Sequence, residues 1–211
     1  MNFFKKYGYI IFLVFLIASL FDMRFALIAI ICMVAPIIIS LFGKGRYWCG
    51  NFCPRGSFFD NILSYVSPKI KVPRFFRSIF LRAFMVLFII YMFANGVSKN
   101  WGNLFGIGLV FYRIIVGTSI VGIVLGLFIS HRTWCNFCPM GSIASLITKI
   151  RGKKISLKVS STCINCNICT KTCPMGISPK DYKNGYVLNS DCIHCNECLN
   201  ACPKNSIQKN F

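Results

Sequence analysis

The chain has 211 residues, of which 55% are hydrophobic, and its 21 Phe stand against only 5 acidic residues. Its 24 Lys and Arg give a formal net charge of +19, and its mean hydropathy is +0.62. The apolar residues form long runs rather than scattered core positions, which excludes a soluble enzyme and a disordered chain. A chain this basic and this apolar is typical of an integral membrane protein with positive cytoplasmic loops, rather than of a protein that binds nucleic acid.

Four hydrophobic spans predict four transmembrane helices. They cover residues 7–21, 25–42, about 79–94, and a stretch within 104–130. Only three residues separate the first two spans, so these form an antiparallel hairpin. Spans of 15 to 18 residues lie near the lower limit for crossing a bilayer, for which about 20 residues are typical. A signal peptide is the alternative for the first span, although no A-x-A-like site follows it. Residues 95–109 are expected to form an outer loop or interfacial segment.

Positive charges predict the orientation of these helices. With both termini inside, 21 of the 24 basic residues fall in inner segments, and only Arg24, Lys99 and Arg113 fall outside. Such an excess of Lys and Arg sets orientation strongly. We therefore expect a multi-pass protein of the cell (inner) membrane, with both termini in the cytoplasm.

A repeated motif follows the second and fourth spans. Residues 46–57 read RYWCGNFCPRGS and residues 132–142 read RTWCNFCPMGS, so Arg, Trp, Cys, Asn-Phe-Cys-Pro and Gly-Ser recur in order. The repeat predicts an all-α membrane domain, residues 1–150, made of two hairpins that are each followed by a cysteine loop.

Short interfacial helices are expected after both copies of the motif. The apolar stretches that follow cover residues 58–67 and 143–150. A serine side chain commonly caps the N-terminus of a helix, so we expect Ser57 and Ser142 to be the N-caps.

Two cysteine runs near the C-terminus each follow the pattern C-x2-C-x2-C-x3-C-P. In bacterial two-cluster ferredoxins, three thiolates of each run bind one cluster and the fourth Cys binds the other cluster. We therefore expect one 4Fe–4S cluster on Cys163, Cys166, Cys169 and Cys202, and a second on Cys192, Cys195, Cys198 and Cys173. Two zinc sites are the alternative, although zinc ligand pairs usually lie farther apart.

These runs predict a small α+β bacterial-type ferredoxin domain at residues 155–211. Lys153, Lys154 and their neighbours are expected to form a short joint to the membrane domain.

Four further cysteines, Cys49, Cys53, Cys135 and Cys138, lie in the two copies of the motif, on the same inner side. Repeats of the same orientation pack about an axis along the membrane normal, so their loops are expected to meet. Four converging thiolates would form a third iron–sulfur cluster. Redox-active dithiols, a transient metal site and purely structural thiols are the alternatives, and a stable disulfide is disfavoured in the cytoplasm.

Two membrane hairpins with C-x3-C-P-like motifs, followed by a two-cluster ferredoxin, resemble the NapH/NosR/CcoG group of membrane polyferredoxins over nearly the whole chain. The second motif departs from the group's pattern, because Cys135 and Cys138 are spaced C-x2-C-P. The likeness to NosR is limited to its membrane and cluster part. The resemblance implies electron transfer between the cytoplasmic side or the quinone pool and an extracytoplasmic reductase system.

The spans contain no His, Asp or Glu, so we expect no b-type haem with paired axial histidines and no ion relay. There is no P-loop and no G-x-G-x-x-G fingerprint in a strand–helix setting, so no nucleotide site is expected. The basic residues Lys44, Arg46 and Arg55 are interpreted mainly as topology determinants, which also balance a negative cluster or dock an acidic electron donor.

The leading hypothesis is an electron-transfer subunit, within a larger complex, that links a cytoplasmic or quinol donor to a membrane or extracytoplasmic redox partner. One alternative is an enzyme, a copper or other metal-ion reductase that uses the membrane Cys pairs. Another is a redox sensor or assembly factor. Cluster potentials span roughly −700 to +450 mV with similar ligands, so the sequence does not set the direction of electron flow.

Overall fold

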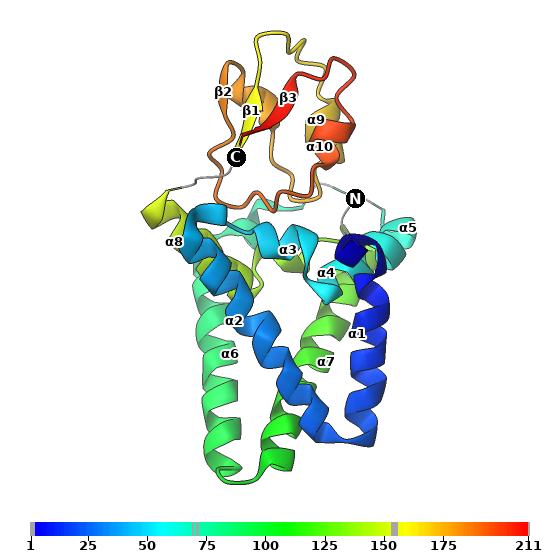
Figure 1. The fold of residues 1–211 in the computed structure, drawn as a ribbon, viewed down its shortest axis with the longest axis vertical. Helices are drawn as coiled ribbons and strands as arrows, with labels where there is room; N and C mark the ends of the chain where they lie inside the picture. Colours follow the sequence, from blue (N-terminus) through cyan, green and yellow to red (C-terminus); the bar gives the residue numbers. More distant parts are fainter. Residues whose placement is uncertain (1–2, 69, 71, 153–155, 211) are drawn as a thin grey trace.

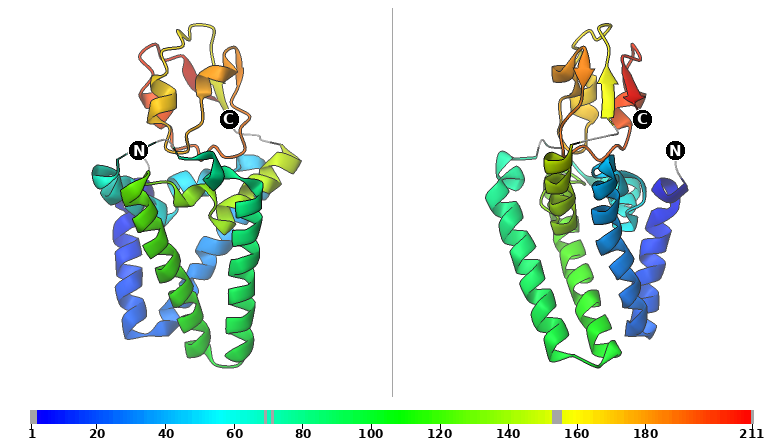
Figure 2. Two further views of the ribbon diagram at one scale, coloured as in Figure 1. Left: turned by 180° about the vertical axis from the view of Figure 1, so that it is seen from behind. Right: turned by 60° about the vertical axis from the view of Figure 1, so that its left-hand side comes forward.

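The computed structural model describes residues 3–68, 70, 72–152 and 156–210. The protein is mostly helical, with four long apolar helices and a small three-stranded sheet at one end (Figure 1). Short helices lie between the long helices and the sheet, and the views of Figure 2 show the same arrangement from other sides. The expected joint at Lys153 and Lys154 lies outside the described residues.

Four helices are long and apolar enough to cross a membrane. They are α1 (Phe3–Phe21), the segment Met23–Lys44, α6 (Ile79–Lys99) and α7 (Leu104–Phe128). They contain 19, 22, 21 and 25 residues, so the first three are longer than their apolar runs suggested and all four are close to the length that crosses a bilayer. Length and composition are therefore consistent with a membrane protein.

The second long segment changes its helical type along its length. It begins as the 3₁₀ helix η1 (Met23–Ile28), continues as α2 (Ala29–Ile39) and ends as the π-helix η2 (Ser40–Lys44). Pro36 lies inside α2 and has no N–H to donate to the preceding turn. Gly43, with φ 79°, ends the helical run just before the first cysteine loop.

The predicted length of the outer loop, residues 95–109, is wrong, because both flanking helices extend into this range. Asn100 stabilises the end of α6 by donating its side-chain N–H to the Gly96 carbonyl over 2.9 Å. Asn103 caps α7 by accepting two backbone N–H groups of its first turn. Residues 100–103 alone therefore connect α6 and α7. Arg113, expected near the outer interface, lies on an exposed side of α7, about 13 Å from the start of that helix.

Short helices lie within the cysteine motifs and after them. They are α3 (Tyr47–Asn51), α4 (Pro54–Phe58), η3 (Phe59–Leu63), α5 (Ser64–Val66), η4 (Arg74–Arg77), η5 (Trp134–Asn136) and α8 (Pro139–Arg151). The predicted serine N-caps are wrong: α4 and α8 are capped by Cys53 and Cys138, and each starts with Pro, which suits the first helical position. The Ser57 hydroxyl instead accepts the Tyr9 N–H and donates to the Lys5 carbonyl, which joins α4 to α1.

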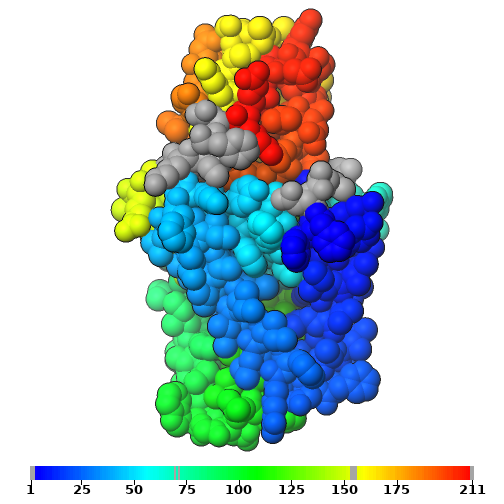
Figure 3. All heavy atoms as spheres, viewed as in Figure 1, coloured from blue at the N-terminus to red at the C-terminus, as the bar shows by residue number. Residues whose placement is uncertain are grey.

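The C-terminal part is built on a small antiparallel sheet of order β2-β1-β3. Its elements are β1 (Ser156–Val159), α9 (Ile168–Thr172), η6 (Pro179–Tyr182), β2 (Gly185–Tyr186), α10 (Glu197–Asn200) and β3 (Ile207–Asn210). Val159 pairs with Ile207, and both are buried together with Leu157, Val187 and Ile193. Figure 3 shows this part as a lobe stacked directly on the helices.

Candidate metal centres

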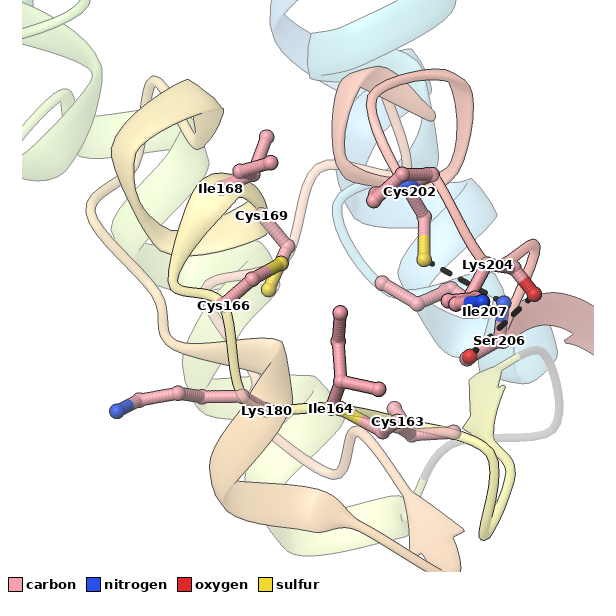
Figure 4. A pocket seen from close by; sticks show the side chains of 12 residues that line it. Cys163, Ile164, Cys166, Ile168, Cys169, Lys180, Cys202, Lys204, Ser206 and Ile207 are labelled. Carbon is pink, nitrogen blue, oxygen red and sulfur yellow. Dashed lines mark hydrogen bonds between the residues drawn. The ribbon is translucent and has the colours of Figure 1, made fainter.

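The eight C-terminal cysteines line two separate hollows. One hollow is lined by Cys163, Cys166, Cys169 and Cys202 (Figure 4), and the other by Cys173, Cys192, Cys195 and Cys198. In each hollow, three cysteines of one run face the last cysteine of the other run. The structure therefore brings together the same two sets that the spacing grouped.

Matching backbone conformations shape the two cysteine runs. Three pairs of equivalent positions have a left-handed φ between 47° and 65°, namely Asn165 and His194, Asn167 and Asn196, and Gly176 and Asn205. Few residues other than glycine adopt this region, and Asn and His are among those that do so most often. The two runs therefore follow the same local path around their hollows. His194 adopts the left-handed conformation at this turn, and its side chain is buried.

Backbone N–H groups point at the last cysteine of each run. The Ile177 N–H donates to Cys173 Sγ over 3.3 Å, and the Ser206 N–H donates to Cys202 Sγ over 3.4 Å. Figure 4 shows the Cys202 contact, with Cys166 and Cys169 on the opposite side of the hollow. Hydrogen bonds to the sulfurs are among the features with which a protein tunes an iron–sulfur cluster. Four thiols, mostly apolar walls and these donors suit an iron–sulfur cluster.

Arg46 and Arg132 hold together the two loops that carry the repeated motif, residues 46–57 and 132–142, which are called the membrane cysteine loops below. They occupy the same position in the two copies of the motif, and both side chains are 1% exposed. Arg46 Nη2 donates to the Cys135 carbonyl, while Arg132 Nη1 donates to the Cys49 carbonyl over 3.1 Å. Each arginine thus binds the backbone of the other copy, next to its cysteine.

A glycine in each copy makes room for the arginine of the other copy. A Cβ on Gly56 would lie 2.8 Å from Arg132 Nη1, and a Cβ on Gly141 would collide with the guanidinium of Arg46. Gly56 and Gly141 are equivalent positions, both three residues after a Cys that precedes Pro. The repeated glycine therefore serves the close approach of the two loops.

Two carboxylates neutralise part of this buried charge. Asp60 binds Arg132 through both oxygens, at 2.7 and 2.6 Å. Asp191 binds Arg82 at 3.0 and 2.8 Å and Arg46 at 3.3 Å. Burial alone would raise the pKa of both carboxyls, but the guanidiniums hold the pKa of each below its usual value. Both aspartates are therefore ionised at neutral pH.

The four thiols of the membrane loops lie in this positive surrounding. Arg132 Nη1 is 3.5 Å from Cys135 Sγ, Arg55 Nη2 is 3.6 Å from Cys138 Sγ, and the Gly56 N–H donates to Cys53 Sγ over 3.4 Å. Burial raises the pKa of the Cys49 thiol to about 12; Arg46 opposes this rise, whereas Cys53, Cys138 and Cys135 add to it. All four cysteines are therefore close enough to influence one another.

The second hollow lies against the membrane loops. Cys49 and Cys135 pack on the buried cluster that contains Ile193. The backbone of α3 approaches so closely that a Cβ on Gly50 would collide with the Ile193 carbonyl. The Asn51 side chain also donates to the His194 carbonyl over 3.3 Å. The loop that carries Cys192 and Cys195 therefore rests on α3.

None of the 13 cysteines, all of which lie among the described residues, forms a disulfide. Within the part of the chain that the structure describes, no three His, Cys, Asp or Glu side chains form a group that could hold a metal ion.

Sequence reasoning missed the roles of Asp60 and Asp191, and it interpreted Arg46 mainly as a topology determinant. Asp60 and Asp191 lie in segments that show no repeat, so only the folded chain brings them to Arg132 and Arg46. Arg recurs at the same position of both motifs, and this recurrence could have indicated that the two guanidiniums have a structural role.

Comparison with known proteins agrees with the iron–sulfur chemistry. Residues 25–73 and 112–158, which each contain one copy of the motif, match a family model described as "4Fe-4S binding domain". Residues 162–207 match one described as "4Fe-4S dicluster domain".

Two uncharacterized proteins of Methanocaldococcus jannaschii are similar to this chain. One is 23% identical over 160 residues, which cover 72% of this chain and 60% of the relative. The other is 24% identical over 161 residues, which cover 70% of this chain and 66% of the relative. The chain thus spans less than two thirds of the length of either relative. No solved structure matches. The chain carries 4Fe-4S ferredoxin domains, and these support an iron–sulfur electron-transfer role.

Proposed function

We propose that this protein is a membrane-bound electron-transfer subunit that holds three 4Fe–4S clusters. It links a cytoplasmic or quinol donor to a membrane or extracytoplasmic redox partner, as its resemblance to the NapH/NosR/CcoG group implies. Two clusters belong to the C-terminal cysteines, in a ferredoxin-type domain. The third belongs to Cys49, Cys53, Cys135 and Cys138, where two hairpin repeats meet. Both termini lie in the cytoplasm, and further subunits complete the complex.

The charge around the membrane cysteines carries this proposal. Four guanidiniums, those of Arg46, Arg55, Arg82 and Arg132, are accompanied by the carboxylates of Asp60 and Asp191. Two positive charges therefore remain in a largely buried site. A 4Fe–4S core with four thiolates carries a charge of about −2, which would neutralise them. Without such a group, the buried cations would cost several kcal/mol.

The geometry of the two loops supports the same site. The reciprocal bonds of Arg46 and Arg132 give the loops equivalent positions about a common centre. Redox-active dithiols are a weaker explanation, because neutral thiols or a disulfide would leave the two positive charges of the site uncompensated.

The residues around the site prepare it for one-electron chemistry. When bound, a 4Fe–4S cluster takes up and releases single electrons. Arg55 and Arg132, which contact cysteine sulfurs, stabilise added negative charge and so raise the reduction potential. Trp134 and Phe137 pack with Cys135 and Cys138 and keep water away from them.

Iron and acid-labile sulfide per chain test the proposal. In anaerobically purified protein we expect about 12 iron per chain, because each cubane contains four. The double variant Cys135→Ser/Cys138→Ser should fall to about 8, because two serines replace two of the four ligands. Cys32→Ser is the matched control: Cys32 lies in α2 and belongs to neither motif, although it is within electrostatic range of Cys53 and Arg55, and the variant should keep about 12.

About 8 iron in all three proteins would overturn the third cluster and leave the membrane cysteines as thiols. Fewer than 8 iron in the wild type would overturn the two C-terminal clusters as well.

A further inference from the structure

The two hollows of the C-terminal lobe differ in what covers them. The hollow of Cys173, Cys192, Cys195 and Cys198 lies against α3, as described above. The loop that follows β1 and leads to Cys163 lies at the end of the lobe away from the long helices (Figure 1). The hollow that this loop helps to form is lined by residues of the C-terminal lobe. One of its cysteines, Cys166, is exposed.

Exposed apolar and basic side chains surround this outer hollow. Ile164 is 59% exposed and Ile168 is 39% exposed, and both line the hollow. The half-buried Lys180 and the exposed Lys204 line it as well (Figure 4), and Lys171 on α9 is exposed. An apolar centre with a charged rim is the usual composition of a protein–protein interface.

The acidic residues of the lobe are directed away from this surface. Asp191 binds Arg46 and Arg82, and Glu197 binds Lys5 over 2.6 Å, so both face the helical part. Asp181 lines a different hollow beside Arg77. The lobe therefore presents lysines where the outer hollow opens, and the chain as a whole carries a large positive charge.

We propose that Ile164, Ile168, Lys180 and Lys204 form the docking surface for a soluble, acidic one-electron carrier protein. Its carboxylates would pair with the two lysines, and its redox group would face the exposed edge of the Cys166 hollow. The carrier loses one electron, and the cluster held by Cys163, Cys166, Cys169 and Cys202 gains it. This inference rests on the proposed electron-transfer function and adds the site and the chemical class of the donor.

Binding of a purified, acidic flavodoxin, in its oxidised form, to the cluster-loaded protein tests the surface directly. The dissociation constant is measured by calorimetry at low and high salt for the wild type and for Lys180→Gln/Lys204→Gln. The matched control is Lys6→Gln/Lys149→Gln, which removes the same charge from exposed positions of the helical part. A carbodiimide cross-link between flavodoxin carboxylates and lysines then maps the contact.

At low salt we expect the Lys180/Lys204 variant to bind about tenfold more weakly, and the control to change less than twofold. High salt should remove the difference, because screened charges no longer attract the carrier. The cross-link should join Lys180 or Lys204. Stopped-flow mixing with the reduced flavodoxin should show the same tenfold loss in the second-order rate of flavin oxidation.

Equal losses in the two variants, an absence of binding, or a cross-link confined to other lysines would each overturn the docking surface. If such a sample still carries its full iron, the electron-transfer function stands and only the docking site is wrong. A wild-type protein with fewer than 8 iron would instead overturn the function.

Discussion

At the scale of single residues, the two motifs depend on an exchange of side chains between copies. The guanidinium of Arg46 lies against Gly141, and that of Arg132 lies against Gly56. Each arginine donates to a carbonyl of the other loop. Both side chains are only 1% exposed, so they have little room to move. A small change at either glycine therefore reaches the cysteines through the arginine.

We predict that Gly141→Ala displaces Arg46 and loosens the membrane cysteine site. The added methyl overpacks a buried position, which costs about 1–3 kcal/mol. Iron should fall by up to four per chain, and the thermal unfolding midpoint in detergent should fall as well. Gly117→Ala on α7 is the control, because its Cβ would meet open space. Full iron and an unchanged midpoint in Gly141→Ala would contradict this account of the glycine.

The sequence indicated which C-terminal cysteines lie together, but it did not indicate which charged residues pair around the membrane cysteines. Cysteine spacing grouped the eight C-terminal thiols as the structure groups them, because the pattern is local. Asp60 reaches Arg132 across 72 positions, and Asp191 reaches Arg46 across 145, so no local pattern reports these contacts. The capping role assigned to Ser57 and Ser142 was wrong because Cys-Pro already supplies the helix start.

At the scale of elements, the loop between β2 and α10 makes several of the contacts between the C-terminal lobe and the helices. The segment between β2 and α10 contains Asp191, Ile193 and His194, which contact side chains or backbone of the helical part. Figure 1 shows this loop along the upper side of α3. Asp191 contributes most, because it binds two guanidiniums and accepts the Ser145 hydroxyl over 2.9 Å.

Asp191→Asn should therefore loosen this loop without unfolding the long helices. Loss of hydrogen bonds to a charged group costs about 1.5–3 kcal/mol, and it leaves Arg46 without its carboxylate. Hydrogen exchange followed by mass spectrometry should show about tenfold faster exchange in residues 187–197 and in α3. Asp181→Asn removes an exposed carboxylate of the same lobe and should leave both segments as protected as in the wild type. Equal exchange in the two variants would refute the role of Asp191.

The four long helices could be predicted from hydropathy, but their ends could not. Each apolar run stops at the first polar residues, whereas the helix continues until its terminal backbone groups are satisfied. Asn100 and Asn103 satisfy these groups between α6 and α7, where about three further helical turns replace most of the expected loop. The sequence likewise did not indicate the π-helical end of the second segment, because that turn is governed by Gly43 and by tertiary packing.

At the scale of the whole molecule, all cysteine motifs lie at the same end of the helices, so one orientation places every cluster site on one side. The excess of Lys and Arg at this end predicts that it is cytoplasmic. Trp101→Cys, in the exposed loop between α6 and α7, should then react with a membrane-impermeant maleimide in intact spheroplasts.

Lys149→Cys, at an exposed position near the other end, is the matched control and should react only after permeabilisation. Mass spectrometry of the labelled peptide separates the introduced thiol from the native ones. The reverse pattern would overturn the predicted orientation and place the ferredoxin-type lobe outside the cytoplasm.

The contact of Lys5 with Glu197 has a consequence for synthesis of the chain. These residues are 192 positions apart, and Lys5 also donates to the Cys195 carbonyl. At 5–20 residues per second, roughly 10–40 s pass between their translation. During that interval Lys5 lacks its partner Glu197 and Arg46 lacks its partner Asp191. The C-terminal lobe therefore does not yet cover the two Cys-Pro loops. The segment that closes the site is translated after both Cys-Pro loops, which gives assembly of the protein a fixed order in time.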